Sequence, residues 1–456
     1  MVKLKFFLNS FFLLFAGVVF SQVNHPLQMG IGVVNITTDT STVLDPLHVK
    51  GIVFKQGAEQ FALVECDIIS IPNDIVSIRK KAAQTIGIPY NNITVSATHN
   101  HMAGSYKDIS LAIVEALSKA KADLKPVTLR SGVGQQFNVS FNRRYFMKDG
   151  SVVFNPMFLN PEIVRPAGTI DPDVGLVMFY NATTNKPVSA LTNFAMHLDV
   201  VKEYGSVYQN TGAGSRNSVS ADYPYWLEEN FRKDYGKDFT SIFLTGCCGN
   251  INHWDFSKPG PQSGHKTKSK EIGDSLYSSI KRELPKLKAE NANLGSRYKI
   301  VNVPLQAYTE ADLNWARNLD KKSLSSRSEE PNDRKKFLDD VRRRRYMALE
   351  SYKREGKGNT VALDVQVFRL TDNTAIVTLP GEMFVEFGMN IKNNSPFENT
   401  IVVEMSNNSI AYVPTKKAFL QGGYEVENSR IAAGGGEMLA NAAIQMLNEL
   451  KVGINN

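Results

Sequence analysis

Five apolar segments of the chain each end on a polar side chain that can do chemistry, and this repeated pattern constrains the fold more than any other feature. In the first, residues 94–97 form a strand-like run that leads into His99 and His101. Residues two apart on an extended backbone point to the same face, so both imidazoles are expected on one side of the strand end. Two such histidines can bind a metal, or one can bind it while the other exchanges a proton. A polar loop with two solvated histidines would give the same pattern, so this segment alone leaves both interpretations open.

The other four segments repeat this form. They are residues 190–196 before His197, residues 241–245 before the segment 246–253, residues 375–379 before Glu382, and residues 401–405 before Tyr412. In open α/β sheets, ligands bind beyond the carboxyl ends of the strands. Strand ends of this composition therefore predict one built site at the edge of a sheet.

Helical and strand-like periodicities alternate along the rest of the chain. Helices are predicted over residues 75–86, 108–122, 383–392 and 438–450, with another that opens at Pro224, and strands over parts of residues 29–70, 127–155, 359–370 and 374–379. This alternation is typical of the α/β class, with mixed α+β as the alternative. We expect layered mixed β-sheets flanked by helices, with the site at the C-terminal ends of the strands.

Residues 1–21 have the organisation of a signal peptide. Lys3 and Lys5 give a positive start, and residues 11–20 are an apolar run too short to span a membrane as an ordinary helix. We expect cleavage before Gln22 and export, which places the protein in the periplasm or outside the cell.

The mature part, residues 22–456, is expected to form a single catalytic domain. No linker, low-complexity tract or internal repeat marks a boundary within it. Its three cysteines, Cys66, Cys247 and Cys248, are too few for a disulfide scaffold, so the fold must depend on its core.

The formal net charge of +7 comes largely from residues 266–288 and 321–357, which include the run of arginines at 342–345. The second region predicts two helices broken near Pro331. A basic helical face attracts anionic lipid or nucleic acid. Acidic residues are interleaved with the basic ones, which favours a solvated surface helix, and no nucleic-acid motif accompanies it. We therefore expect no nucleic-acid partner.

The candidate site supplies a recognisable ligand set. His99, His197 and Glu382 offer two imidazole nitrogens and one carboxylate, which is a catalytic-zinc set if one position stays open. Zinc lowers the pKa of a bound water toward ~7 and polarises a carbonyl oxygen. His101 and Arg143 are expected close enough to donate to a developing oxyanion. The ligands are scattered along the chain, so no spacing rule supports this assignment.

Several motifs taken together resemble the neutral, non-lysosomal ceramidase family in its catalytic domain. They occur in the family's order and extend over nearly the whole mature chain. The matching stretches are residues 30–37, Ser96-Ala97-Thr98-His99-Asn100-His101, Phe141-Asn142-Arg143, Asn193-Phe194-Ala195-Met196-His197, residues 246–252, Leu379-Pro380-Gly381-Glu382, residues 411–415 and Gly422-Gly423-Tyr424-Glu425.

The resemblance implies a mononuclear zinc amidase with one Zn²⁺ per chain. Its metal ligands map to His99, His197, Glu382 and Tyr412. Its residues that contact the scissile amide and the oxyanion map to His101 and Arg143, and Asn252 falls on the substrate side. Tyr412 is a ligand by resemblance alone, because a buried tyrosine at a strand end more simply donates a hydrogen bond.

Two departures from the family pattern fall on the substrate side. The family's H-x-H-S-G-P reads His101-Met102-Ala103-Gly104-Ser105, and its G-D-x-S/N-P reads Gly249-Asn250-Ile251-Asn252-His253, without the acid or the proline. We also expect the chain to lack the C-terminal β-sandwich domain of longer family members.

Three functions therefore compete. The first is a ceramide amidohydrolase that releases sphingosine and fatty acid. The second is the same zinc amidase or esterase acting on another acylated lipid, glycan or peptide, and the third is a non-catalytic binding protein. We expect an N-acylated small molecule as the substrate, contact with a membrane surface, and no obligate protein partner.

Overall fold

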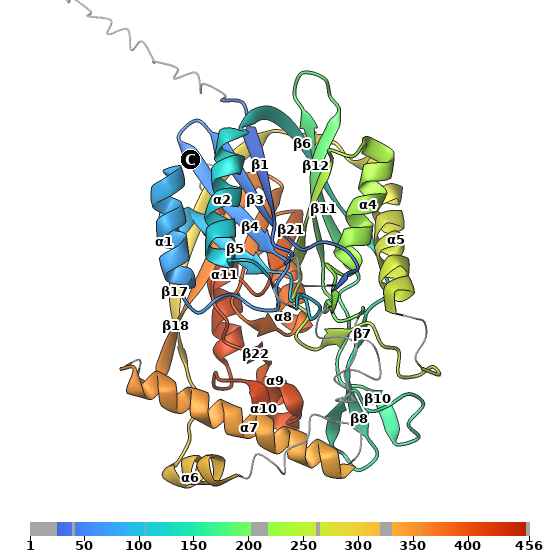
Figure 1. The fold of residues 1–456 in the computed structure, drawn as a ribbon, viewed down its shortest axis with the longest axis vertical. Helices are drawn as coiled ribbons and strands as arrows, with labels where there is room; N and C mark the ends of the chain where they lie inside the picture. The colour runs from blue at the N-terminus through green and yellow to red at the C-terminus, as the bar shows by residue number, and fades with distance from the viewer. Residues whose placement is uncertain are drawn as a thin grey trace, which may run out of the picture.

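The protein is described by a computed structural model that covers residues 25–38, 42–104, 106–201, 218–260, 265–319, 331–356 and 358–452. The predicted signal peptide lies outside the described residues. Two mixed β-sheets pack face to face, with helices on both outer surfaces (Figure 1). The predicted α/β class with layered mixed sheets is confirmed. No helix in the described ranges has the length and apolar character needed to cross a membrane.

The larger sheet has the strand order β14-β12-β11-β6-β1-β3-β4-β5, with β16 added to β6. Neighbours β4 and β5 are parallel, as are β12 and β14, and the other pairs are antiparallel. The strands are β1 (Gln28–Asn35), β3 (His48–Gln56), β4 (Glu59–Cys66), β5 (Ile93–Ala97), β6 (Lys125–Gln135), β11 (Asp173–Asn181), β12 (Pro187–Phe194), β14 (Thr240–Thr245) and β16 (Ala289–Glu290).

The smaller sheet has the order β17-β18-β19-β21, in which β19 and β21 are parallel. Its strands are β17 (Ala292–Pro304), β18 (Thr360–Thr371), β19 (Thr374–Thr378) and β21 (Asn399–Val403). The inner faces of the two sheets share one apolar cluster. Phe61 of the larger sheet stacks on Phe368 of the smaller one, with ring centroids 4.7 Å apart. Alternating side chains thus give each sheet one face toward its partner and one toward helices.

Helices α1 (Ile75–Ile86) and α2 (Ile109–Ala122) cover one half of the larger sheet, and α4 (Tyr223–Tyr235) and α5 (His265–Glu283) cover the other half (Figure 1). Helix α2 lies very close to β1. A Cβ atom built on Gly32 would lie 2.0 Å from the carbonyl oxygen of Ala116, so only glycine permits this approach.

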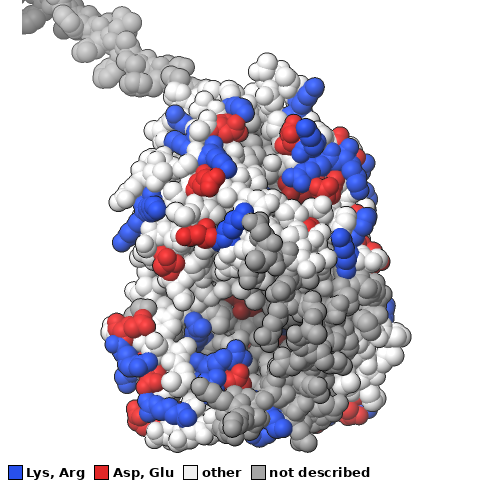
Figure 2. All heavy atoms as spheres, in the orientation of Figure 1, with Lys and Arg blue, Asp and Glu red and all other residues white. Residues whose placement is uncertain are grey.

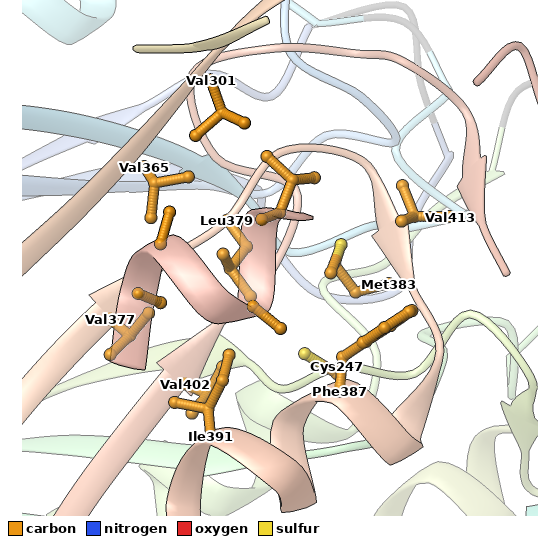
Figure 3. Packing of buried hydrophobic residues seen from close by; sticks show 14 of the residues in the cluster. Cys247, Val301, Val365, Val377, Leu379, Met383, Phe387, Ile391, Val402 and Val413 are labelled. Atoms are coloured by element: carbon orange, nitrogen blue, oxygen red, sulfur yellow. The ribbon is translucent and has the colours of Figure 1, made fainter. Parts of the chain in front are cut away.

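The outer face of the smaller sheet is covered by α8 (Val385–Asn393) and α11 (Gly435–Val452). Figure 3 shows Val402 of β21 beside Ile391 of α8, within the same apolar cluster as Val365 and Val377. The predicted closing helix is confirmed, although it begins at Gly435 rather than at residue 438.

Short strand pairs lie beyond the ends of the main strands and build the surroundings of the candidate site. They are β20 (Glu382–Met383) with β22 (Tyr412–Val413), β7 (Phe141–Asn142) with β15 (Ile251–Asn252), β2 (Thr42–Val43) with β13 (Ser218–Val219), and β8 (Arg144–Met147) with β9 (Val152–Phe154) and β10 (Ile163–Pro166).

A long connection between β17 and β18 carries α6 (Glu310–Asn318) and α7 (Pro331–Arg354), and α7 packs against α10 (Tyr424–Asn428), which follows α9 (Lys416–Gln421). The long basic helix begins at Pro331, near the predicted break. The prediction of a solvated surface helix is wrong for Arg345, which is buried and lies 3.2 Å from Glu427. Arg342 also pairs with Glu427, at 2.9 Å, but stays partly exposed. Acidic and basic side chains are interspersed over the face in Figure 2.

Candidate metal centre

The predicted ligands come from the ends of both sheets and meet at one point. His99 follows β5 and His197 follows β12, while Glu382 follows β19. The distance from His99 Nε2 to Glu382 Oε2 is 3.2 Å, and that from His197 Nε2 to the same oxygen is 3.6 Å. The structure therefore brings together three residues that are far apart in the sequence.

Backbone carbonyls fix both imidazole rings. His99 Nδ1 lies 2.8 Å from the carbonyl oxygen of Ile69, and His197 Nδ1 lies 2.9 Å from that of Cys248. A carbonyl oxygen only accepts, so each Nδ1 carries a hydrogen, and each Nε2 is the ring nitrogen that faces Glu382. This arrangement, with an oxygen partner on the far nitrogen, is the usual outer support of a metal-binding histidine.

The local backbone is shaped to deliver these side chains. His99 has a positive φ of 62°, which turns the chain sharply at the end of β5. Gly381, just before Glu382, has a φ of 72°, and a Cβ atom there would lie 2.6 Å from the carbonyl oxygen of Ala411. The Pro-Gly-Glu motif therefore needs its glycine because the backbone passes close to the segment that carries Tyr412.

The donor spacing fits a small tetrahedral cation. Ligand bonds of about 2.1 Å at tetrahedral angles place donor atoms roughly 3.4 Å apart, and the two measured separations, 3.2 and 3.6 Å, lie on either side of that value. His99 Nε2 and Glu382 Oε2 are buried and have no hydrogen-bond partner within the described part of the chain. A bound cation would satisfy both atoms.

The electrostatics of the cluster agree with this fit. Burial by itself lowers the pKa of His99, but the adjacent Glu382 carboxylate outweighs burial and raises it to about 9. Burial by itself raises the pKa of Glu382, but His99 and His197 hold it well below its usual range. Burial and the nearby Arg143 guanidinium lower the pKa of His197. The cluster thus favours one positive charge between His99 and Glu382, where a metal ion would lie.

Tyr412 is placed beside Glu382 by strand pairing. The two residues are directly opposite each other in the parallel β20–β22 ladder, and Tyr412 is buried. The Arg143 guanidinium carbon lies 5.2 Å from the centre of its ring. The fourth predicted ligand therefore belongs to the same cluster.

His101 also lies in this cluster. One ligand atom from each of His99, His101 and His197 lies within 4.8 Å of the others, which makes these three histidines a second candidate donor set. The rings of His99 and His101 are 4.9 Å apart. Both sets share His99 and His197, and they differ in whether Glu382 or His101 completes the coordination.

Arg143 is buried and directed at the same point. Its Nη1 lies 3.2 Å from His197 Nε2, its Nη2 donates to the carbonyl oxygen of Gly249 at 2.8 Å, and its Nε donates to Glu425 at 2.9 Å. The neighbouring Arg144 is also buried, and its guanidinium lies 3.7 Å from the same Glu425. Arg144 therefore cannot serve as a control position for substitutions of Arg143.

The Asn252 side chain makes two hydrogen bonds to neighbouring residues. Its amide donates to Asn155 Oδ1 at 3.0 Å and accepts from the backbone N–H of Trp254 at 3.0 Å. It is buried on β15, next to the strand that leads to Arg143. Its contact with substrate stays a prediction.

Sequence reasoning missed several residues at this site. Tyr424 lies 5.3 Å from Tyr412 and stacks on Phe154 at 4.5 Å, and Phe337 of α7 lies 5.4 Å from Tyr424 (ring centroids). Glu425 holds both arginines. The stretch Gly422-Gly423-Tyr424-Glu425 was a signal for two of these residues, whereas no sequence pattern connects Phe154 or Phe337 with the site.

Comparison with known proteins gives a structural match. No protein-family model and no curated protein matches the sequence. The structure of neutral ceramidase from Pseudomonas aeruginosa matches with a TM-score of 0.65 and 17% identity, covering 94% of this chain and 75% of that one. The chain has the neutral ceramidase fold. A ceramidase structure complexed with C2 also matches, with a TM-score of 0.65 and 16% identity, covering 95% of this chain and 76% of that one.

The match confirms the resemblance that the motifs indicated. At this level of identity, the ceramidase fold is shared while the chemistry must be argued from this chain's own side chains. Those side chains provide a buried donor set for one metal ion and an arginine directed at it.

Proposed function

We propose that the protein is a zinc-dependent amidohydrolase that cleaves the amide bond of N-acyl-sphingosine to give sphingosine and a fatty acid. One observation carries the proposal: two imidazole nitrogens and one carboxylate oxygen converge, buried, at the spacing of zinc ligands. This is the ligand composition of a hydrolytic zinc site with an open position.

His99, His197 and Glu382 would hold the metal, with Tyr412 beside them. Zinc in that position supplies a polarised carbonyl and a water of lowered pKa, near ~7. The carbonyls of Ile69 and Cys248 hold each Nδ1 hydrogen, so each Nε2 is the nitrogen that would bind the metal.

Arg143 would bind the oxygen of the scissile carbonyl. Its guanidinium keeps its charge at every relevant pH and presents directed N–H donors. Glu425 and the carbonyl of Gly249 hold it from behind, so it needs little reorganisation as negative charge develops on that oxygen. His101, at the edge of the cluster, would contact the amide.

The residues around the centre favour an N-acyl lipid as the substrate. Tyr424, Phe154 and Phe337 form a continuous aromatic surface that begins beside Tyr412. An acyl chain gains roughly 0.8 kcal/mol for each methylene that it buries against such a surface. Another acylated lipid would use the same surface.

The wider setting is also part of the proposal. Export through residues 1–21 would place the enzyme in the periplasm or outside the cell, and a lipid substrate implies contact with a membrane surface. The proposal includes no nucleic-acid partner and no obligate protein partner.

The test uses the purified mature protein, its metal content, and a panel of N-acyl lipids and N-acyl amino acids. We expect one zinc per chain and release of fatty acid from ceramide that stops on chelation and returns with zinc. Stoichiometric zinc without hydrolysis of any member of the panel would instead support a binding protein, and hydrolysis that resists chelators would exclude the metal mechanism.

A further inference from the structure

A second histidine–carboxylate pair lies beside the metal centre. His253 Nδ1 is 2.9 Å from Asp199 Oδ1, and the side chains are 1% and 22% exposed. Since the carboxylate accepts the Nδ1 hydrogen, Nε2 is the nitrogen that can gain or lose a proton. His253 Nε2 is buried and has no hydrogen-bond partner among the described residues.

Both members of this pair are attached to segments that build the centre. The segment 248–250, just before His253, gives its carbonyl oxygens to His197 Nδ1 (from Cys248) and to the side chain and backbone N–H of Arg143 (from Gly249 and Asn250). Asp199 is two residues after His197, and the intervening Leu198 accepts the backbone N–H of His101 at 2.9 Å. The hydrogen bond between His253 and Asp199 therefore joins two segments of the chain, and these segments contact or carry His101, His197 and Arg143.

The charged groups around His253 are few. Asp199 is its hydrogen-bond partner, and Asp222, which accepts the backbone N–H groups of Val200 and Val201, is close enough to act on it electrostatically. The Trp254 ring covers its imidazole, with centroids 4.1 Å apart.

Amide hydrolysis needs such a donor. An amine leaves an acyl group poorly unless its nitrogen is protonated as the C–N bond breaks. The Arg143 guanidinium does not release its proton, and the Nε2 atoms of His99 and His197 face Glu382. The remaining histidines near the centre are His101 and His253, and of these two His253 has the hydrogen bond from Nδ1 to a carboxylate. A histidine with its Nδ1 held by a carboxylate has the arrangement of the general acid–base residue in hydrolytic triads. In the ceramidase pattern a proline takes the place of His253, so this group is a feature of the present chain.

We propose that His253, oriented by Asp199, donates the proton to the leaving amine; this inference rests on the proposed amidase function. His253 Nε2–H gives its proton to the amide nitrogen, which also takes the electron pair of the breaking C–N bond. The attacking water gives its oxygen to the acyl carbon. One of its protons returns to His253 and the other leaves with the fatty acid, which then ionises.

The test compares two substrates with the same acyl chain: an N-acyl alkylamine and a p-nitrophenyl ester, whose phenolate leaves without protonation. For His253→Gln we expect a loss of about 10²-fold or more in kcat on the amide and a change within about threefold on the ester. Zinc content and KM for both substrates stay at the wild-type values. Asp199→Asn gives the same selective loss, smaller in size.

Asp234→Asn is the matched control for loss of one carboxylate. Asp234 bonds Tyr277 and Lys281 on the outer helices, away from the centre. We expect wild-type kcat on both substrates for this variant.

An equal loss on both substrates would show that the pair is merely structural, loss of zinc would make His253 a ligand, and wild-type amide turnover would exclude it from the reaction. Each of these results overturns the inference while leaving the amidase function in place. A wild-type enzyme that hydrolyses neither substrate would overturn the proposed function itself. ¹⁵N NMR of the histidine rings in the wild-type protein needs no stable variant. It should show a hydrogen on Nδ1 of His253, bonded to Asp199, and the reverse tautomer would contradict the proposal.

Discussion

The two sheets contribute to the candidate centre in different ways. The larger sheet supplies nitrogen donors, and His99 and His197 come within three residues of the ends of β5 and β12. The smaller sheet supplies oxygen donors, and Glu382 and Tyr412 lie on β20 and β22, an extra pair of strands beyond β19 and β21. The nitrogen side is thus fixed locally by each strand, whereas the oxygen side depends on pairing between two distant segments.

The two sheets also differ in what they bury. The helix-covered face of the smaller sheet is an apolar cluster (Figure 3). The other sheet buries charged groups, among them Lys50, which lies 3.0 Å from Glu228 and 3.9 Å from Glu65. The larger sheet therefore carries a buried ionisable cluster whose protonation affects stability.

The largest effect is expected when a nitrogen donor from the larger sheet is removed. For His99→Ala and His197→Ala we expect loss of bound metal and of turnover by more than the 10- to 100-fold that loss of an outer hydrogen-bond partner typically costs. Metal content by mass spectrometry and turnover are measured together, with circular dichroism to confirm the fold. Full zinc content in either variant would show that the larger sheet does not provide the ligands.

The next largest effect is expected for Arg143, whose guanidinium lies near both His197 and Tyr412. Arg143→Lys keeps the charge but loses the paired N–H donors, so we expect turnover to fall roughly 10²- to 10³-fold with zinc retained. Arg79→Lys is the control, because Arg79 on α1 is another buried arginine and is paired with Asp364 of β18 rather than with the centre. A Lys variant with near wild-type turnover would remove Arg143 from the site.

A smaller effect is expected on the oxygen side. Tyr412→Phe keeps the ring and the strand pairing but removes the phenol oxygen, so zinc affinity should fall on the order of 10-fold, less than for the histidine variants. A competition titration with a chelator measures this. If Tyr412→Phe lost as much affinity as His99→Ala, the two sheets would contribute equally and the contrast between them would disappear.

The last prediction concerns stability rather than activity, and it tests the buried charges. Burial raises the pKa of Asp45 from 3.8 to about 6, although hydrogen bonds from Ser220 and Ala221 partly oppose it. The folded state therefore holds its proton more tightly than the unfolded state. The stabilisation is fully present below about pH 4 and is lost as the pH rises to about 6, a change on the order of 3 kcal/mol.

Asp45→Asn mimics the protonated acid and cannot titrate. Relative to wild type, this variant should gain stability between pH 4 and pH 7 in urea unfolding. The exposed Asp74, whose side chain caps nothing on α1, provides the control Asp74→Asn with no such trend. A constant difference between Asp45→Asn and wild type at all pH values would contradict this account.

The sequence predicted the nitrogen side of the centre better than the oxygen side. A buried strand followed by a histidine is a local pattern, and both His99 and His197 were found from it. Glu382 was found from its apolar run, but the need for Gly381 beside Ala411 is visible only in three dimensions. Tyr412 came from the family resemblance, because its position depends on pairing with Glu382, and no local pattern encodes such a contact. His253 and Asp199 were missed for the same reason.

The connection that carries α6 and α7 has a consequence for engineering. Pro304 and Thr360 are register partners, and the Leu305 N–H donates to the carbonyl of Asn359 at 2.9 Å, so the connection leaves and rejoins the smaller sheet at one point. The entropic cost of closing a loop grows only slowly with its length. A connection whose two ends lie side by side on the sheet can therefore be replaced by one of different length. Since α7 carries Phe337 to the aromatic surface, grafting different connections here would change that surface while leaving the candidate metal centre in place.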